Sequence, residues 1–260
     1  MKIIIYFILP VFIFIFAGCA GSPYGHDTLF QISTINALMD GAYRGEMTIG
    51  QLKKYGDFGI GTLDALDGEM IALDGKFYQI KADGVACPVP DSMTTPFAVI
   101  TVFDADKTVQ APTGMDYEGI QRYLDGLMLN KGIFYAVKIA GTFKYIKTRS
   151  VPRQKEPYPA LIEAVKSQTV FEFHDVKGTI VGFWCPESAK GVNVPGYHFH
   201  FITQDRKAGG HLLACQVQQA TIRLDYTTEF YMVLPQQTGT PLQSGPSKDR
   251  GKELKKIEQE

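Results

Sequence analysis

The sequence has too few cysteines and too even a charge balance for several classes of protein. Its four cysteines are scattered over 260 residues, at positions 19, 87, 185 and 215, which excludes a small disulfide-stapled scaffold. Lysine and arginine number 26 against 27 acidic residues, a formal net charge of -1. Nucleic-acid-binding proteins need a clustered basic excess that neutralises phosphates, so we expect no nucleic-acid partner. The composition, 45% hydrophobic and 20% charged, is that of an ordinary globular chain.

Long apolar runs are lacking except at the N-terminus. Lys2 precedes the run Ile3–Ala17, which is shorter than the ~20 residues of a membrane-spanning helix and is typical of an export signal. Alanine and glycine before Cys19 are typical of a bacterial lipobox, whose cysteine is acylated. We therefore expect residues 1–18 to be a lipoprotein signal peptide and residues 19–26 a tether. The chain would be exported and anchored by its lipid at the periplasmic or cell-surface face of a membrane; a plain anchor or an ordinary secretory signal is the alternative.

Strand patterns dominate the remainder, which we expect to be one compact unit or two intimately joined halves. Capping signals predict helices over about 48–56, 116–130 and 159–168, and a terminal helix from about Glu253. Turn residues at 176–178 and 207–210 predict antiparallel hairpins. The predicted strands cover residues 77–82, 97–103, 134–146, 170–176, 179–184, 197–203, 211–218 and 220–234.

Three of the five histidines fall close together. In a strand through residues 197–201, period-two alternation sends His198 and His200 to one face, ~7 Å apart along the strand. His211 follows a glycine turn, so the returning strand brings a third imidazole alongside. Three protein ligands leave an open position, which is the arrangement of a catalytic zinc. Cys215 lies four residues further along, and we expect it in the core.

Two further segments carry candidate charged groups. Glu69 lies between two Asp-Gly turn dipeptides on an otherwise apolar stretch. It is either a solvated edge residue, which is the commoner case, or a buried acid with a raised pKa. Arg149 or Arg153, at the end of a long predicted strand, could hold an anionic substrate by a bidentate contact, although an exposed arginine is again the commoner case.

Three blocks together resemble the alpha-acetolactate decarboxylase family in order and spacing. They are GTLDALDGE (61–69), TRSVPRQ (148–154), and PGYHFHFIT (195–203) followed by GGH. The resemblance covers residues 27–260, which we take as the catalytic domain. It implies an α/β fold of two intimately joined mixed β-sheet subdomains with a few helices, with the metal site on a β-hairpin, and a homodimer.

The resemblance also implies a set of site residues. It implies a Zn²⁺ cofactor held by His198, His200 and His211. Glu69 and Arg149 would face the metal, and Thr62 would line the substrate pocket. A glutamate of the C-terminal tail would reach in as a further ligand or acid, and we favour Glu258 among the tail glutamates.

The activity implied by the resemblance is zinc-dependent decarboxylation of 2-acetolactate to acetoin through a metal-stabilised enediolate that is protonated stereospecifically. Arg149 would orient the carboxylate or the developing oxyanion, and Glu69 or the tail glutamate would supply the proton. Two alternatives stay open: a non-catalytic surface lipoprotein that binds a metal or ligand, and a three-histidine metal-dependent oxygenase. The oxygenase is disfavoured because Gln204 and Asp205 stand where its motif has a glutamate.

Overall fold

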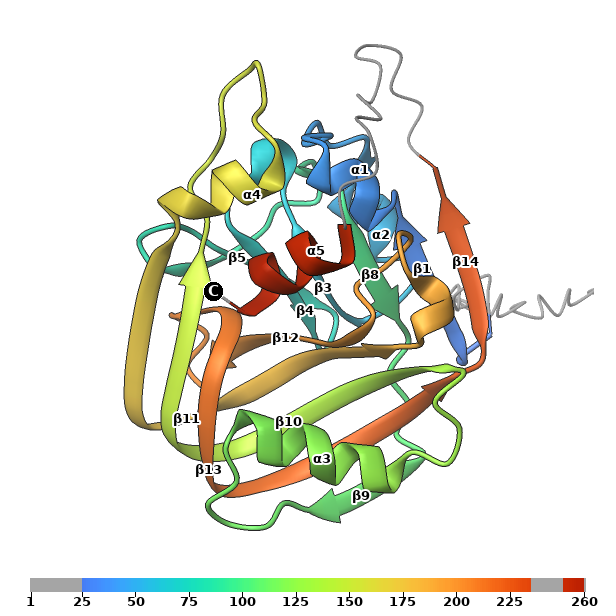
Figure 1. Cartoon of the computed structure of the whole chain (residues 1–260), viewed down its shortest axis with the longest axis vertical. Helices are drawn as coiled ribbons and strands as arrows, with labels where there is room; N and C mark the ends of the chain where they lie inside the picture. Colours follow the sequence, from blue (N-terminus) through green and yellow to red (C-terminus); the bar gives the residue numbers. More distant parts are fainter. Residues whose placement is uncertain (1–24, 235–249, 260) are drawn as a thin grey trace, which may run out of the picture.

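The computed structural model describes residues 25–234 and 250–259. The predicted signal peptide, Cys19 and most of the predicted tether therefore lie outside the described residues, and so does Glu260. Among the described residues, no helix is long and apolar enough to cross a membrane. The architecture consists of two large β-sheets with short helices around them, as Figure 1 shows.

The first sheet has seven strands and is mixed, because β1 and β14 run parallel while the other pairs are antiparallel. Its centre is built from strands that are buried along their whole length, such as β3 and β4. In spatial order the strands are β14 (Glu229–Val233), β1 (Thr28–Ile32), β8 (Ala98–Thr101), β3 (Phe58–Thr62), β4 (Glu69–Leu73), β5 (Lys76–Ile80) and β6 (Ala86–Pro88).

The second sheet has five strands, all antiparallel. Its order is β10 (Phe134–Ser150), β11 (Thr169–Cys185), β12 (Gly196–Thr203), β13 (Gly209–Thr227) and β9 (Lys107–Gln110). Because β10 pairs with β13 as well as with β11, strands β10 to β13 form a closed ring of pairings. A small additional sheet joins β2 (Met47–Thr48) to β7 (Thr94–Thr95).

The helices are short. They are α1 (Ile35–Met39), α2 (Ile49–Leu52), α3 (Tyr117–Leu127), α4 (Leu161–Ala164) and α5 (Arg250–Gln259), with 3-10 turns over Asp64–Leu66, Val165–Ser167 and Glu187–Ala189. The capping box of Thr48 and Gln51 is confirmed, but α2 ends at Leu52 and not near Gly56. Asp116 caps α3 through Gly119 N at 2.7 Å, as predicted, and α3 ends at Leu127, short of Asn130.

One predicted turn is wrong. Residues 176–178 do not separate two strands, because β11 runs unbroken from Thr169 to Cys185 and Gly178 pairs with both Gly141 and Thr203. A Cβ at Gly178 would lie 2.4 Å from the Phe201 ring, so the glycine serves a close approach between strands and not a turn. The predicted break near residue 219 is also wrong, since β13 continues to Thr227.

The two sheets share a core, which confirms the expectation of two intimately joined subdomains. One apolar cluster contains Ile71 of β4, Val181 of β11 and Ile257 of α5, so it spans both sheets and the C-terminal helix. In Figure 1, α5 (red) lies across the centre of the molecule, in front of β3 and β4. Packing at this position places α5 over the junction of the two sheets.

Candidate metal centre and active site

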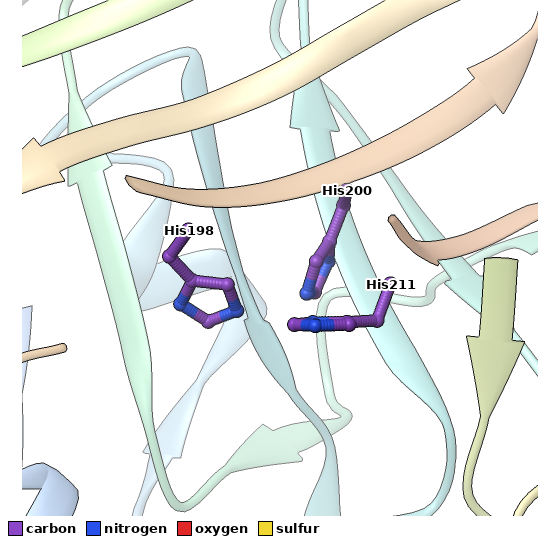
Figure 2. A group of neighbouring side chains, drawn as sticks. All are labelled: His198, His200 and His211. Atoms are coloured by element: carbon purple, nitrogen blue, oxygen red, sulfur yellow. The ribbon is translucent and has the colours of Figure 1, made fainter. Parts of the chain in front are cut away.

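The three predicted histidines meet on the second sheet. His198 and His200 lie on the same face of β12, and His200 is paired directly with His211 of β13. Each imidazole offers one ring nitrogen, and the three nitrogens lie within 4.8 Å of one another. Figure 2 shows the rings converging from the two strands. All three side chains are buried, so the cluster is a candidate metal centre.

The electrostatics of the cluster keep the imidazoles neutral. Burial, with a smaller contribution from the positive charge of Arg149, lowers the pKa of His198 to about 3. Burial likewise holds the pKa of His200 and of His211 well below the ordinary value. His200 Nδ1 lies 3.0 Å from the carbonyl oxygen of Met70, which can only accept, so Nδ1 carries the proton. The Nε2 lone pair of His200 is thereby left for a metal ion.

Glu69 and Arg149 form a buried ion pair beside the histidines. The interpretation of each as an exposed residue is wrong: they are only 7% and 4% exposed. Arg149 Nη1 donates to Glu69 Oε1 at 3.1 Å, and Glu69 Oε2 lies 3.4 Å from His200 Nε2. Their burial follows from the fold, because Glu69 begins β4 where the first sheet faces the second, and Arg149 pairs with His211.

The pKa of Glu69 is raised to about 7, mainly by burial and also by the charge of Glu258, against the opposing charge of Arg149. The carboxyl group of Glu69 therefore exchanges a proton near neutral pH, which is the property of a general acid or base. A buried ion pair is weak evidence for stability, because desolvation offsets much of its attraction. The pair is better explained by chemistry at the site.

The backbone at Gly210 brings Arg149 and His211 together. Its φ of +142° is one that residues with a side chain rarely adopt, and a Cβ there would lie 2.5 Å from the carbonyl oxygen of Arg149. The glycine before His211 thus allows the close approach of β13 to β10. Cys215 is buried in the core of this sheet, as predicted.

The C-terminal helix supplies Glu258. Its Oε2 atom lies 3.6 Å from His198 Nε2 and 3.8 Å from His211 Nε2. Burial raises its pKa to about 7 despite the opposing effect of Arg149. The helix begins at Arg250, earlier than the predicted Glu253, and the side chain of Glu253 lines none of the cavities near the histidines.

Thr62 lines the same chamber, which has a volume of about 50 Å³ and is also bounded by Glu69, Arg149 and the histidines. The Thr62 hydroxyl donates to the carbonyl oxygen of Gly68 at 2.7 Å. That bond ties the end of β3 to the residue before Glu69 and so fixes the start of β4. Thr62 therefore borders the chamber and also positions the acid.

The side chains fit a metal ion. Glu258 Oε2 is buried and has no hydrogen-bond donor among the described residues, although it faces two imidazole nitrogens. A cation between these groups would satisfy the carboxylate and the imidazole lone pairs together. Nitrogen and carboxylate ligands of this kind suit zinc and several other divalent ions.

Sequence reasoning missed the groups that act through backbone atoms or come from distant elements. The carbonyl oxygen of Ile257 accepts from Arg149 Nη2 at 3.1 Å, and the carbonyl of Met70 orients His200. Tyr117 of α3 stands near Glu258, whose charge, after burial, raises the pKa of the phenol. Residue type carries no signal for a carbonyl contact, and nothing in the spacing linked Tyr117 to the tail.

A mixed α/β fold with buried imidazoles, two carboxyl groups of raised pKa and an arginine defines a candidate metal-binding enzyme with acid–base groups. Comparison with known proteins gives the particular family. The family model described as "Alpha-acetolactate decarboxylase" matches residues 29–240, and the chain belongs to that family. It is therefore an enzyme, a decarboxylase of the carbon–carbon lyase class. The match ends before α5, so Glu258 lies beyond it.

Relatives and solved structures agree with this assignment. The chain is 53% identical over 209 residues to the alpha-acetolactate decarboxylase of Methanosarcina mazei, covering 80% of this chain and 73% of the relative. It is 46% identical over 216 residues to that of Methylococcus capsulatus, with 82% and 83% covered. The crystal structure of the Bacillus subtilis strain 168 enzyme superposes with a TM-score of 0.86 at 37% identity, covering 90% of this chain and 100% of the other. The predicted fold class is thereby confirmed.

Proposed function

We propose that this chain converts 2-acetolactate to acetoin and CO₂ with a single zinc ion as cofactor. The observation that carries the proposal is that three neutral imidazoles and the Glu69–Arg149 ion pair converge on one small chamber. The Oε2 atom of Glu258, which has no hydrogen-bond donor among the described residues, faces the same chamber. In the reaction, the bond to the carboxylate carbon breaks and its electron pair moves toward the neighbouring ketone, giving an enediolate. A proton then adds to the carbon that carried the carboxylate.

Glu69 is the proposed proton donor. Its raised pKa keeps a proton available near neutral pH, and its fixed position between Arg149 and His200 presents that proton to one face of the enediolate. Delivery from one face only makes the product a single stereoisomer. After the transfer, the Glu69 carboxylate regains a proton from solvent.

Arg149 is the proposed anion-binding group. Nη1 and Nη2 contact Glu69 and the Ile257 carbonyl, and each nitrogen retains a second N–H. Those groups line the chamber and orient the substrate carboxylate or the oxygen on which charge develops. Because both contacts come from buried elements, the guanidinium is held in place before substrate binds.

The three histidines would hold the zinc ion with Glu258 beside it, and the bound ion supplies a Lewis acid for the charge that develops on the ketone oxygen. Neutral imidazoles are the ligand form, and their low pKa values keep them neutral through the physiological range. The Met70 carbonyl holds the His200 ring in the tautomer that leaves Nε2 to the ion.

Incubation of the purified protein with 2-acetolactate tests the proposed reaction. We expect acetoin and CO₂ in a one-to-one ratio and a single enantiomer of acetoin by chiral chromatography. Absence of acetoin from a folded, metal-loaded sample would refute the reaction and favour the non-catalytic binding lipoprotein. Iron in place of zinc by elemental analysis, together with oxygen uptake, would favour the oxygenase.

We also propose that the chain is exported and tethered to a membrane through a lipid on Cys19. The proposal rests on the charged start, the short apolar run and the small residues before the cysteine. Mass analysis of the membrane fraction should find a chain beginning at an acylated Cys19, and Cys19→Ala should release the protein from that fraction. A retained Met1, or cleavage elsewhere, would contradict it.

We also propose that the chain forms a homodimer, and this part of the proposal rests on the family resemblance alone. Sedimentation of residues 27–260 should give twice the chain mass at micromolar concentration. A monomer under those conditions would overturn the assignment without affecting the chemistry.

A further inference from the structure

Two large cavities adjoin the catalytic chamber, and Glu258 lines all three spaces. The chamber itself is about 50 Å³, whereas the outer cavities are about 640 Å³ and 560 Å³. The Glu258 side chain is 14% exposed, more than the buried histidines beside it, so the chamber opens at this residue. Tyr117, Gln121 and Tyr197 line both outer cavities and stand between them.

The two outer cavities differ in charge. The larger one, which we call the basic cavity, is formed by α3, the segment 187–197 and α5. Its charged lining residues are Lys190, Arg250, Lys252 and Lys255 against Glu187 and Glu258. The other, which we call the acidic cavity, has Arg122 against Glu118, Asp125 and Glu258.

Ion pairs reduce this contrast without reversing it. Arg250 is held by Asp40 at 3.0 Å, and Lys190 lies 3.8 Å from Glu187 in the basic cavity. In the acidic cavity, Asp125 is paired with Lys131 at 2.9 Å and Glu118 with Arg122 at 3.4 Å. Lys255 is exposed and has no carboxylate within ion-pair distance among the residues that the structure describes. Lys255 therefore leaves a positive charge on the basic side, whereas the charged residues of the acidic cavity pair with one another or with Lys131, apart from Glu258, which both cavities share.

We infer that the basic cavity is the entrance for the anionic substrate, and that the acidic cavity offers it no net attraction. This inference rests on the proposed function, because 2-acetolactate is a monoanion while acetoin and CO₂ are neutral. A cleft lined by one sign of charge raises the local concentration of the opposite ion and its rate of arrival. Substrate thus reaches Glu258 along α5, and the neutral products leave through either cavity.

Charge reversal at one residue of each cavity tests the inference. At low ionic strength, Lys255→Glu should lower kcat/KM for 2-acetolactate about 3- to 10-fold and leave kcat unchanged. The loss should shrink at about 0.5 M salt, where the Debye length is only a few ångströms. Inhibition by added acetoin should not change, because acetoin is neutral. Glu118→Lys in the acidic cavity should leave kcat/KM within about twofold.

Lys76→Glu is the matched control, since Lys76 is exposed, lines none of the three cavities and produces the same change in net charge. It should leave kcat/KM unaltered. An equal loss in Lys76→Glu would assign the effect to overall charge and refute the entrance. A gain of several-fold in Glu118→Lys with no effect of Lys255→Glu would place the entrance at the acidic cavity.

A probe that cannot react separates this inference from the proposed reaction. Calorimetry with 2-hydroxy-2-methylpropanoate, a carboxylate without the ketone, should show weaker binding to Lys255→Glu than to wild type at low salt. If the probe shows this charge dependence but no acetoin forms, the entrance stands and the proposed reaction fails. If acetoin forms but neither kcat/KM nor probe binding responds to Lys255→Glu, the reaction stands and the entrance fails.

Discussion

Arg149 and Glu69, eighty positions apart in the sequence, form a buried ion pair with Arg149 Nη1 3.1 Å from Glu69 Oε1. The pair links the second sheet to the first at the chamber. Arg149 extends the link to the C-terminal helix through the carbonyl oxygen of Ile257. The side chain of Arg149 thus holds both the carboxylate of Glu69 and the C-terminal helix in place.

Glu69→Gln keeps the shape of the side chain and removes its proton exchange. We expect folding and metal content to be unchanged and kcat to fall by roughly 10² or more, the scale of a positioned acid. Steady-state kinetics with metal analysis of the same sample checks this. Glu172→Gln, at an exposed position on β11, should have no effect. Equal activity of wild type and Glu69→Gln would remove Glu69 from the mechanism.

Arg149→Lys keeps the charge but loses the planar fork that contacts Glu69 and Ile257 together. Loss of one charge-assisted hydrogen bond costs ~1.5–3 kcal/mol, which corresponds to a drop in kcat/KM of roughly 10- to 150-fold. Arg153→Lys is the control, because Arg153 is exposed and forms ion pairs with the half-buried carboxylates of Asp64 and Asp67, away from the histidines. A large loss of kcat/KM in Arg153→Lys, with no loss in Arg149→Lys, would assign the anion-binding role to Arg153 instead.

Among the tail glutamates, only Glu258 should matter to turnover. Glu258→Gln removes the carboxylate that faces His198 and His211, so we expect weaker zinc binding and kcat lowered by about 10-fold or more. Competition with a chromogenic chelator measures the zinc affinity. Glu253→Gln on the same helix lines no cavity and should behave as wild type. A larger effect at Glu253 would contradict the geometry.

Asp225 gives a pH dependence that is independent of the catalytic centre. Its pKa is raised to about 7, mainly by burial and also by the charges of Asp106, Asp27 and Asp104, although the hydrogen bond from Asp104 N lowers it. The folded state therefore holds a proton that the unfolded chain loses near pH 4. The free energy of unfolding should fall as pH rises from about 4 to about 7, and then level off as far as this group is concerned.

Asp225→Asn keeps an acceptor for Asp104 N and cannot ionise. It should therefore remove the part of the fall in the free energy of unfolding that comes from Asp225. Thermal unfolding of wild type and variant across pH 4 to 9 measures the difference. The two curves should diverge in favour of the variant above about pH 5. Parallel curves would mean that Asp225 has an ordinary pKa in the folded protein.

Local patterns were enough to predict the histidine hairpin. Alternation along residues 197–201 and the glycine turn before His211 are short-range features, and the structure pairs His200 with His211 as they indicate. The burial of Glu69 and Arg149 was not accessible from local pattern, because it depends on one sheet covering the other. Only the family resemblance brought these residues to the site.

Longer-range pairing also explains the errors in the fold. Lys177-Gly178 has the composition of a turn, but β10 and β12 flank β11 there and keep the strand continuous. Strands β1 and β3 were missed because they are short and fully buried, so they lack the alternation that reveals a half-exposed strand. The position of Glu258 depends on how α5 packs against the common core, which its sequence does not specify.

Titration of the metal-free protein with zinc, followed by the initial rate of acetoin formation from 2-acetolactate, tests the central claim most directly. The account predicts negligible activity without metal, a linear rise with added zinc and a plateau at one zinc per chain. His200→Ala, which removes one of the three converging imidazoles, should show no saturable rise at the same concentrations. Full activity in the metal-free protein, or a rise that bears no relation to one zinc per chain, would contradict it.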